Sequence, residues 1–119
     1  MISFQSYADA SKIVGKICKA TASSIFGYDH KLIELDNVVD DVAYVHYINA
    51  RDKSRRAIKC RLDRDRVVWA SDNSAYLKRW RTSPQDDIVL YSIVKNNLTI
   101  SQEEVDGSIS HDVYKLSGL

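Results

Sequence analysis

A helical hydrophobic pattern stands out in one part of this chain, residues 6–26, and this single helix constrains what the rest can form. Small and apolar side chains recur there at spacings of three and four, which places them on one buried stripe. The stripe consists of Ala10, Ile13, Val14, Ile17, Cys18, Thr21 and Ile25. Ser6 and Asp9 are typical of a helix start, and Gly27 follows where a C-terminal cap belongs. We therefore predict one amphipathic helix, which can cover only one face of a sheet.

The sequence after Gly27 changes to β-branched and aromatic runs that are separated by polar pairs, which indicates strands. We predict strands near residues 31–37, 42–50, 56–62, 66–71, 87–95 and 98–103. The first of these runs also fits a short helix. The chain from Gly107 onward fits either a final strand or one helical turn that ends at Gly118.

The basic stretch 52–71 reads as a hairpin whose register can be predicted. If residues 63–66 make the turn, Leu62 lies opposite Val67 and Cys60 opposite Trp69. Opposed residues share a face of the sheet, so these four form an apolar surface together with Ile58. The other face then carries Lys59, Arg61, Val68 and Ala70.

A second hairpin is predicted to turn at Asn96 and Asn97, because Asn tolerates a positive φ. This turn sets Ile93 opposite Ile100. One face of the hairpin then carries Leu90, Ser92, Val94, Thr99 and Ser101. Neither face of this hairpin is wholly polar.

These elements predict an α+β fold in which residues 1–119 form a single domain. One N-terminal amphipathic helix packs on a four- to five-stranded antiparallel sheet. The order of elements resembles the cystatin-like arrangement, in which the sheet wraps around the helix, but this likeness in topology implies no function. The second face of the sheet is left partly apolar on one hairpin and basic on the other. Because a monomer seldom leaves such a surface bare, we expect a homodimer, a protein partner or a ligand groove there.

Charge is distributed unevenly along the chain, although the net charge is only +1. Residues 51–81 hold eleven Lys and Arg against four acids, a local charge of +7. We predict that a protein partner is bound by Arg55, Arg56, Lys59, Arg61, Leu90 and Val94, and an acidic partner would complement the four cations. The alternative is a nucleic-acid-binding module that uses the basic 51–81 segment. The interspersed acids and the nearly neutral total charge argue against it.

Residues that could carry chemistry are scattered. The three histidines are single, and none forms a pair at metal-ligand spacing. His46 would face the core after a five-residue loop at 51–55, and outward after a six-residue loop. The four glycines are isolated, so the sequence offers no phosphate-binding loop. We therefore expect no enzymatic activity, no metal and no cofactor.

Cys18 and Cys60 both fall on apolar stripes, and we interpret them as reduced core residues; a disulfide would be expected only in a secreted protein. The N-terminus lacks the build of a signal peptide, and no apolar run suits a membrane span, so we expect a cytoplasmic protein. The leading hypothesis is a small interaction protein of adaptor or inhibitor type, self-associating through the open face of its sheet. A further alternative is an α+β cone that holds a small ligand in a cavity of a few hundred cubic ångströms.

Overall fold

The computed structural model describes residues 7–73 and 79–119, with side chains described from Ile13 onward. The helix α1 spans Tyr7–Phe26. Its predicted stripe is confirmed from Val14 to Thr21, where the side chains are buried, while Ile25 packs partly buried against the core. Gly27 has a φ of +65° and ends the helix, as its position predicted. The predicted start at Ser6 and the side chains of Asp9 and Ala10 lie outside this description.

In the described part of the chain, seven antiparallel strands follow α1 in a meander, each paired with the next along the chain. They are β1 (Glu34–Val39), β2 (Val42–Ile48), β3 (Arg55–Asp63), β4 (Arg66–Ser71), β5 (Ile88–Val94), β6 (Asn97–Glu103) and β7 (Ile109–Lys115). The α+β class is confirmed, but the predicted number of four to five strands is wrong. The two ambiguous segments account for the difference, since each holds both a 3-10 turn and a full strand. These turns are η1 (His30–Leu32) and η2 (Leu116–Gly118).

The hairpin of β3 and β4 has the predicted register, with Cys60 opposite Trp69 and Leu62 opposite Val67. The hairpin of β5 and β6 does not, because it turns at residues 95–96 and Lys95 takes a φ of 56°. This register sets Tyr91 opposite Ile100, an apolar pairing, and Ile93 opposite Leu98. The shift is by two residues, so every side chain keeps its predicted face.

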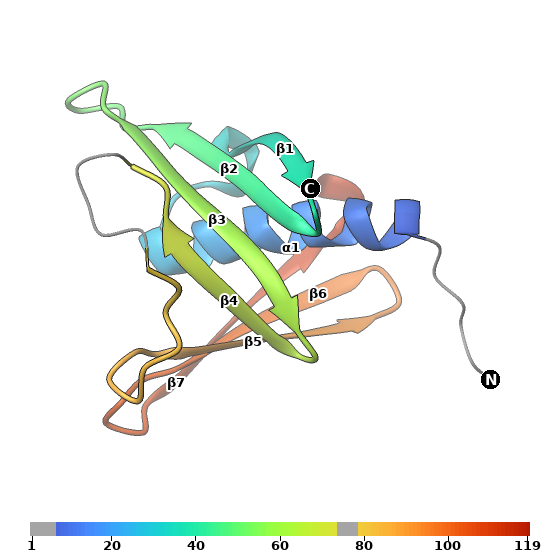
Figure 1. Ribbon diagram of the computed structural model, residues 1–119, viewed down its shortest axis with the longest axis vertical. Coiled ribbons are helices and arrows are strands. Elements are labelled where there is room, and N and C mark those ends of the chain that lie inside the picture. The colour runs from blue at the N-terminus through green and yellow to red at the C-terminus, as the bar shows by residue number, and fades with distance from the viewer. Residues whose placement is uncertain (1–6, 74–78) are drawn as a thin grey trace.

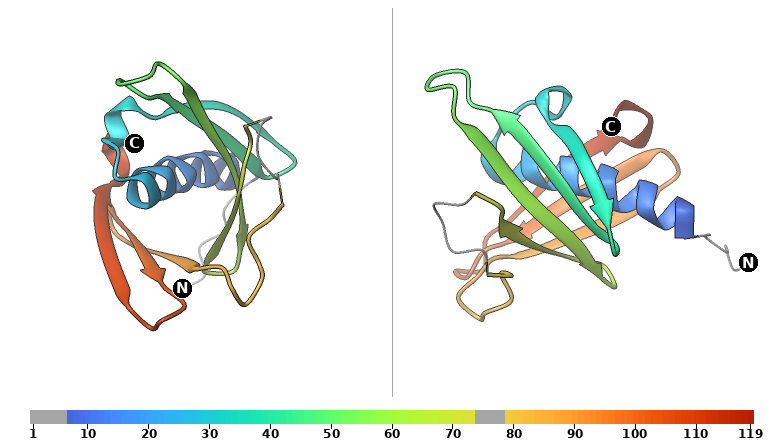
Figure 2. Two further views of the ribbon diagram at one scale, coloured as in Figure 1. Left: turned by 90° about the vertical axis from the view of Figure 1, so that its left-hand side faces the viewer. Right: turned by 45° about the horizontal axis from the view of Figure 1, so that its top comes forward.

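The sheet curves around α1, which lies inside it along much of the helix length (Figure 1, Figure 2). Its core is formed by side chains that are almost fully buried, among them Ile17, Val45, Val67, Leu98 and Ile100. The curve is sharpest where β4 meets β5, because these strands share only the pair Arg66 and Leu90. Beyond that pair, residue 81 takes the place of β5 beside β4, and its backbone N–H donates to the Trp69 carbonyl at 2.9 Å.

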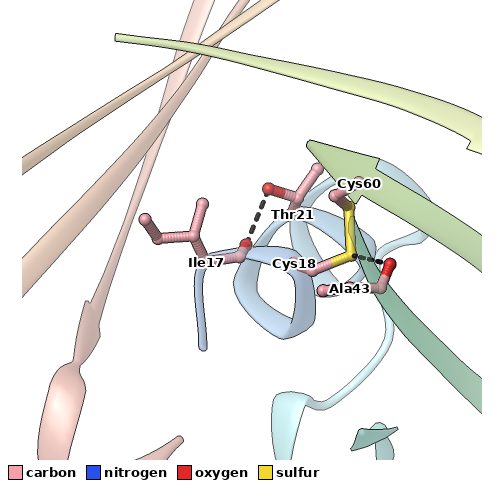
Figure 3. The surroundings of a disulfide bond; sticks show 5 residues. All are labelled: Ile17, Cys18, Thr21, Ala43 and Cys60. Atoms are coloured by element: carbon pink, nitrogen blue, oxygen red, sulfur yellow. Dashed lines mark hydrogen bonds between the residues drawn. A yellow bond between two sulfur atoms is a disulfide. The ribbon is translucent and has the colours of Figure 1, made fainter. Parts of the chain in front are cut away.

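A disulfide between Cys18 of α1 and Cys60 of β3 joins the helix to the sheet (Figure 3). The interpretation of two reduced cysteines is therefore wrong. Both predicted stripes face each other across the core, which brings the two Cα atoms to 5.7 Å, within the range a disulfide requires. Both residues are fully buried.

Among the helices described, none has the length and apolar character needed to cross a membrane. The expectation that the sequence carries no membrane-spanning helix holds for this part of the chain.

Candidate functional site

The predicted basic face of the β3–β4 hairpin is occupied by Trp80. Lys59 and Arg61 point outward as predicted, and their charged ends lie 4.6 Å and 5.1 Å from the centroid of the Trp80 ring. Val68 and Ala70, which share this face, are buried at 1% and 0% exposure. The two cations thus contact an aromatic ring of their own chain, an arrangement that favours packing over a free basic platform. Of the predicted basic segment, Tyr76 and Lys78 lie outside the described residues.

Arg55 also has a partner within the chain. Its guanidinium donates to Asp36 at 2.9 Å, and the same carboxylate lies 2.7 Å from Nδ1 of His46. Ile48 pairs with Arg55, so the loop between them has six residues and His46 faces outward. Within the described part of the chain, no group of three or more His, Cys, Asp or Glu side chains is placed to hold a metal ion.

Arg56 lies on the opposite face from its predicted companions. It pairs with Tyr47 across β2 and β3, and shares the inner face of the sheet with Ile58. Alternation along a strand requires this, because residues an even number apart share a face. The four predicted cations therefore do not form one patch.

The two apolar residues of the predicted site differ in exposure. Leu90 is half-buried beside Arg66, whereas Val94 is 66% exposed near the end of its hairpin. β7 adds Ile109 and Val113 to the same outer face, and both are more than half exposed. This outer face of β5–β7 is partly apolar and open to solvent, in contrast to the outer face of β3 and β4.

A pocket of about 660 Å³ lies at the C-terminal end of α1, on the inner side of β2, β3 and β4. Of the predicted site residues, only Arg56 lines it. The remaining lining comes from the helix end, the strands and the segment after residue 78, and consists of Phe26, Tyr47, Ala57, Ile58, Trp69, Ser71, Asn73, Arg79 and Arg81. The described lining combines three arginines with three aromatic rings and contains no carboxylate.

The aromatic wall of the pocket is a connected cluster of rings. The ring centroid of Phe26 lies 5.9 Å from that of Tyr47 and 6.0 Å from that of Trp69. Tyr28 stacks on Tyr47, with the two ring centroids 4.2 Å apart. Phe26 is 41% exposed, so an apolar surface faces the opening. Burial raises the pKa of the Tyr47 hydroxyl, which therefore stays protonated at neutral pH.

Two of the arginines are anchored by one carboxylate. Arg79 donates to both oxygens of Asp86, at 2.8 Å and 2.9 Å, and this pairing lowers the pKa of Asp86 to about 2. Arg81 lies 3.8 Å from the same carboxylate, with its guanidinium 4.4 Å from the centroid of the Trp69 ring. Its Nε is buried and has no hydrogen-bond partner. Asp86 thus ties Arg79 and Arg81 together within the segment after residue 78.

Arg56 is the arginine with the weakest partners. Its Nε donates to the Ser54 hydroxyl at 3.1 Å, and its nearest carboxylate, on Asp52, is 3.6 Å away and 55% exposed. Among the described residues, the three guanidinium groups of the lining have ion pairs with two carboxylates, those of Asp52 and Asp86. Asn73 uses its side-chain oxygen to accept from the Ala57 N–H at 3.0 Å, so the group it can offer a ligand is its NH₂ donor.

Comparison with protein-family models, with curated proteins and with solved structures finds no match to this chain. The choice among functions therefore depends on the geometry of the site. One sequence signal pointed to the pocket: Arg56 is a cation that continues the apolar inner stripe of β3. The contributions of Phe26 and Arg81 come from positions far apart in the chain, and no local pattern indicates that they meet.

Proposed function

We propose that this protein is a non-enzymatic binding protein that takes up a small ligand in the pocket at the C-terminal end of α1. The observation that carries the proposal is an aromatic-lined pocket of about 660 Å³ with a few polar donors at its rim. Ligand pockets typically measure about 300–1,000 Å³ and have this mixture of apolar wall and sparse polar groups. The ligand-holding cone, the third alternative from the sequence, is thus the one the geometry supports best.

Binding is proposed rather than catalysis because of the chemistry of the described lining. Arginine keeps its charge at every physiological pH, and the Tyr47 hydroxyl stays protonated, so neither suits proton transfer near neutrality. The remaining polar groups, Ser71 and Asn73, are donors without an adjacent general base in the lining.

Filling the pocket tests this proposal. Ser71 lies on its wall, so Ser71→Phe should abolish saturable, one-to-one binding of the fluorescent probe 1-anilinonaphthalene-8-sulfonate. Ser92→Phe is the matched control, because Ser92 is an exposed strand serine on the outer face of β5. Both variants should melt cooperatively, which excludes probe binding to a partly unfolded state. Equal probe binding by the two variants would contradict the pocket as the site.

The leading hypothesis from the sequence, a protein partner or a second copy on the open sheet face, remains the second candidate. Three apolar residues on one face of the sheet favour it. Val94 of β5 is 66% exposed, and Ile109 and Val113 of the edge strand β7 are 58% and 63% exposed. Sedimentation equilibrium at micromolar concentration tests self-association: a dimer that Val113→Lys dissociates supports the second copy, and a monomer removes the second copy and leaves a different protein partner as this candidate. Nucleic-acid binding through residues 51–81 stays a prediction. The contacts of Arg55 with Asp36, and of Lys59 and Arg61 with Trp80, argue against it, because these cations already have partners within the chain.

We propose an oxidising compartment in place of the cytoplasm. The Cys18–Cys60 disulfide supports this, because such bonds persist mainly in secreted, periplasmic or luminal proteins. Alkylation of the protein from its native cells, followed by mass spectrometry, should find both thiols blocked from reagent until reduction. If both cysteines were alkylated before reduction, the result would instead indicate a reducing compartment.

A further inference from the structure

We infer that the ligand of this pocket is a flat aromatic ring system that carries a single carboxylate, which Arg56 binds. This inference rests on the proposed function and names the ligand's chemical class. The ring system would lie against Phe26 and Trp69, and its carboxylate would point toward the end of β3, where Arg56 stands beside Tyr47.

The aromatic part follows from the shape of the wall. Phe26 and Trp69 are 6.0 Å apart with their planes at 80°, so the two rings present a corner rather than a smooth groove. A flat ring that enters such a corner stacks on one partner and meets the edge of the other, the two arrangements that aromatic pairs prefer. The exposed surface of Phe26 is what such a ring would cover.

The negative charge follows from the electrostatics of the lining. The described lining carries three guanidinium groups and no carboxylate, so a cationic ligand would meet repulsion and an anionic one attraction. Two carboxylates nearby, on Asp86 and Asp52, offset two of these charges. Among the described residues, the lining cations outnumber the carboxylates paired with them, which favours an anionic ligand.

Arg56 is assigned as the anion-binding residue because the other two arginines of the lining already have close partners within the chain. Both terminal nitrogens of Arg79 donate to Asp86, and Arg81 stacks on Trp69 beside the same carboxylate. The ion pair of Arg56 with Asp52 is long and exposed, so a ligand carboxylate can replace it at little cost. A guanidinium binds a carboxylate through two parallel hydrogen bonds, which an amide of the same shape cannot accept.

Isothermal titration calorimetry with three probes tests this assignment: 2-naphthoate, its neutral analogue 2-naphthamide, and the aliphatic carboxylate octanoate. Naphthoate should bind one to one, at least tenfold more tightly than naphthamide and several-fold more tightly than octanoate, because a hydrogen bond to a charged group changes affinity by about tenfold or more. Arg56→Gln should weaken naphthoate binding by about tenfold and leave naphthamide unchanged.

Arg55→Gln is the matched control, since Arg55 has the same charge on the same strand but points to the outer face, where it pairs with Asp36. It should leave all three affinities unchanged. Equal affinity for naphthoate and naphthamide would overturn the carboxylate assignment, and octanoate binding as tightly as naphthoate would overturn the aromatic one.

The outcomes also separate this inference from the proposed function. If no naphthalene probe binds while the anilinonaphthalene dye still binds in a manner that Ser71→Phe abolishes, the ligand class is wrong and the pocket stands. If Ser71→Phe leaves the dye bound, the pocket function fails, and this inference fails with it.

Discussion

Arg56 and Arg61 lie on the same strand, β3, yet they have different surroundings because they point to opposite faces of the sheet. On the outer face, the guanidinium of Arg61 packs against Trp80 beside Lys59, over strand residues that are buried. On the inner face, Arg56 lies at the edge of a pocket, and its ion pair is a long one to an exposed carboxylate. A run of basic residues along a strand therefore does not form a single surface. Strand alternation places Lys59 and Arg61 on the outer face, where Trp80 covers them, and Arg56 on the inner face, where a ligand can reach it.

The largest expected effect comes from placing a carboxylate on the inner face of the sheet, in the core rather than at the pocket. Leu62→Asp should unfold the protein, because Leu62 packs against the core and an unpaired charge there costs several kcal/mol, comparable with total stability. Ile17→Asp, on the facing side of the core, should do the same. Arg61→Asp is the matched control, on the outer face of β3, and should shift the urea midpoint much less, because it buries no charge in the core and removes one cation–π contact with Trp80. Near-native midpoints for Leu62→Asp would mean that the two faces are wrongly distinguished.

The next effect concerns the covalent link between the inner face of β3 and the helix. Cys18→Ala with Cys60→Ala should lower the free energy of unfolding by about 4 kcal/mol, because the disulfide closes a long loop in the unfolded chain. Urea melts with and without dithiothreitol measure it. The reductant should destabilise the wild type and leave the double variant unchanged. A wild-type melt that does not respond to reductant would show that the cysteines are unpaired.

A smaller effect is expected from removing the ring that contacts the outer face. Trp80→Ala should destabilise the protein by about 2 kcal/mol, because a half-buried aromatic ring and two cation–π contacts are lost. Trp80→Phe keeps a ring in place and should recover much of this loss. Thermal melts compare the two. If Trp80→Ala were neutral, the outer face would be as available as the inner one, and the basic patch would return as a candidate site.

The smallest expected effect concerns the carboxylate that anchors two of the pocket arginines. The hydrogen bonds from Arg79 lower the pKa of Asp86 from an ordinary 3.8 to about 2. A depressed folded-state pKa means that Asp86 stabilises the protein above about pH 4, and that this contribution is lost as the pH falls through about 2. Asp86→Asn should therefore lower the melting temperature at pH 7 and flatten its decline between pH 4 and 2. Asp87→Asn, its exposed neighbour, should do neither.

Much of the inner and outer assignment was predictable from local patterns. The β3–β4 hairpin has the predicted register, and the β5–β6 hairpin keeps its predicted faces although its turn lies elsewhere. Side chains alternate with a period of two, so an error of two residues changes partners but not faces. The strand count was not predictable in the same way. β1 and β7 contain polar and exposed residues, because each is an edge strand with little burial to mark it.

The helix, the α+β class and the faces of each hairpin can be predicted from local spacings of three, four and two residues along the chain. The disulfide between Cys18 and Cys60, the position of Trp80 on the basic face and the pocket cannot be predicted in this way, because each joins segments that are distant in the sequence. Phe26, Arg56 and Arg81 meet because the sheet curves around α1 and β4 parts from β5 after one pair. That curvature arises from packing between distant segments, which no local period encodes.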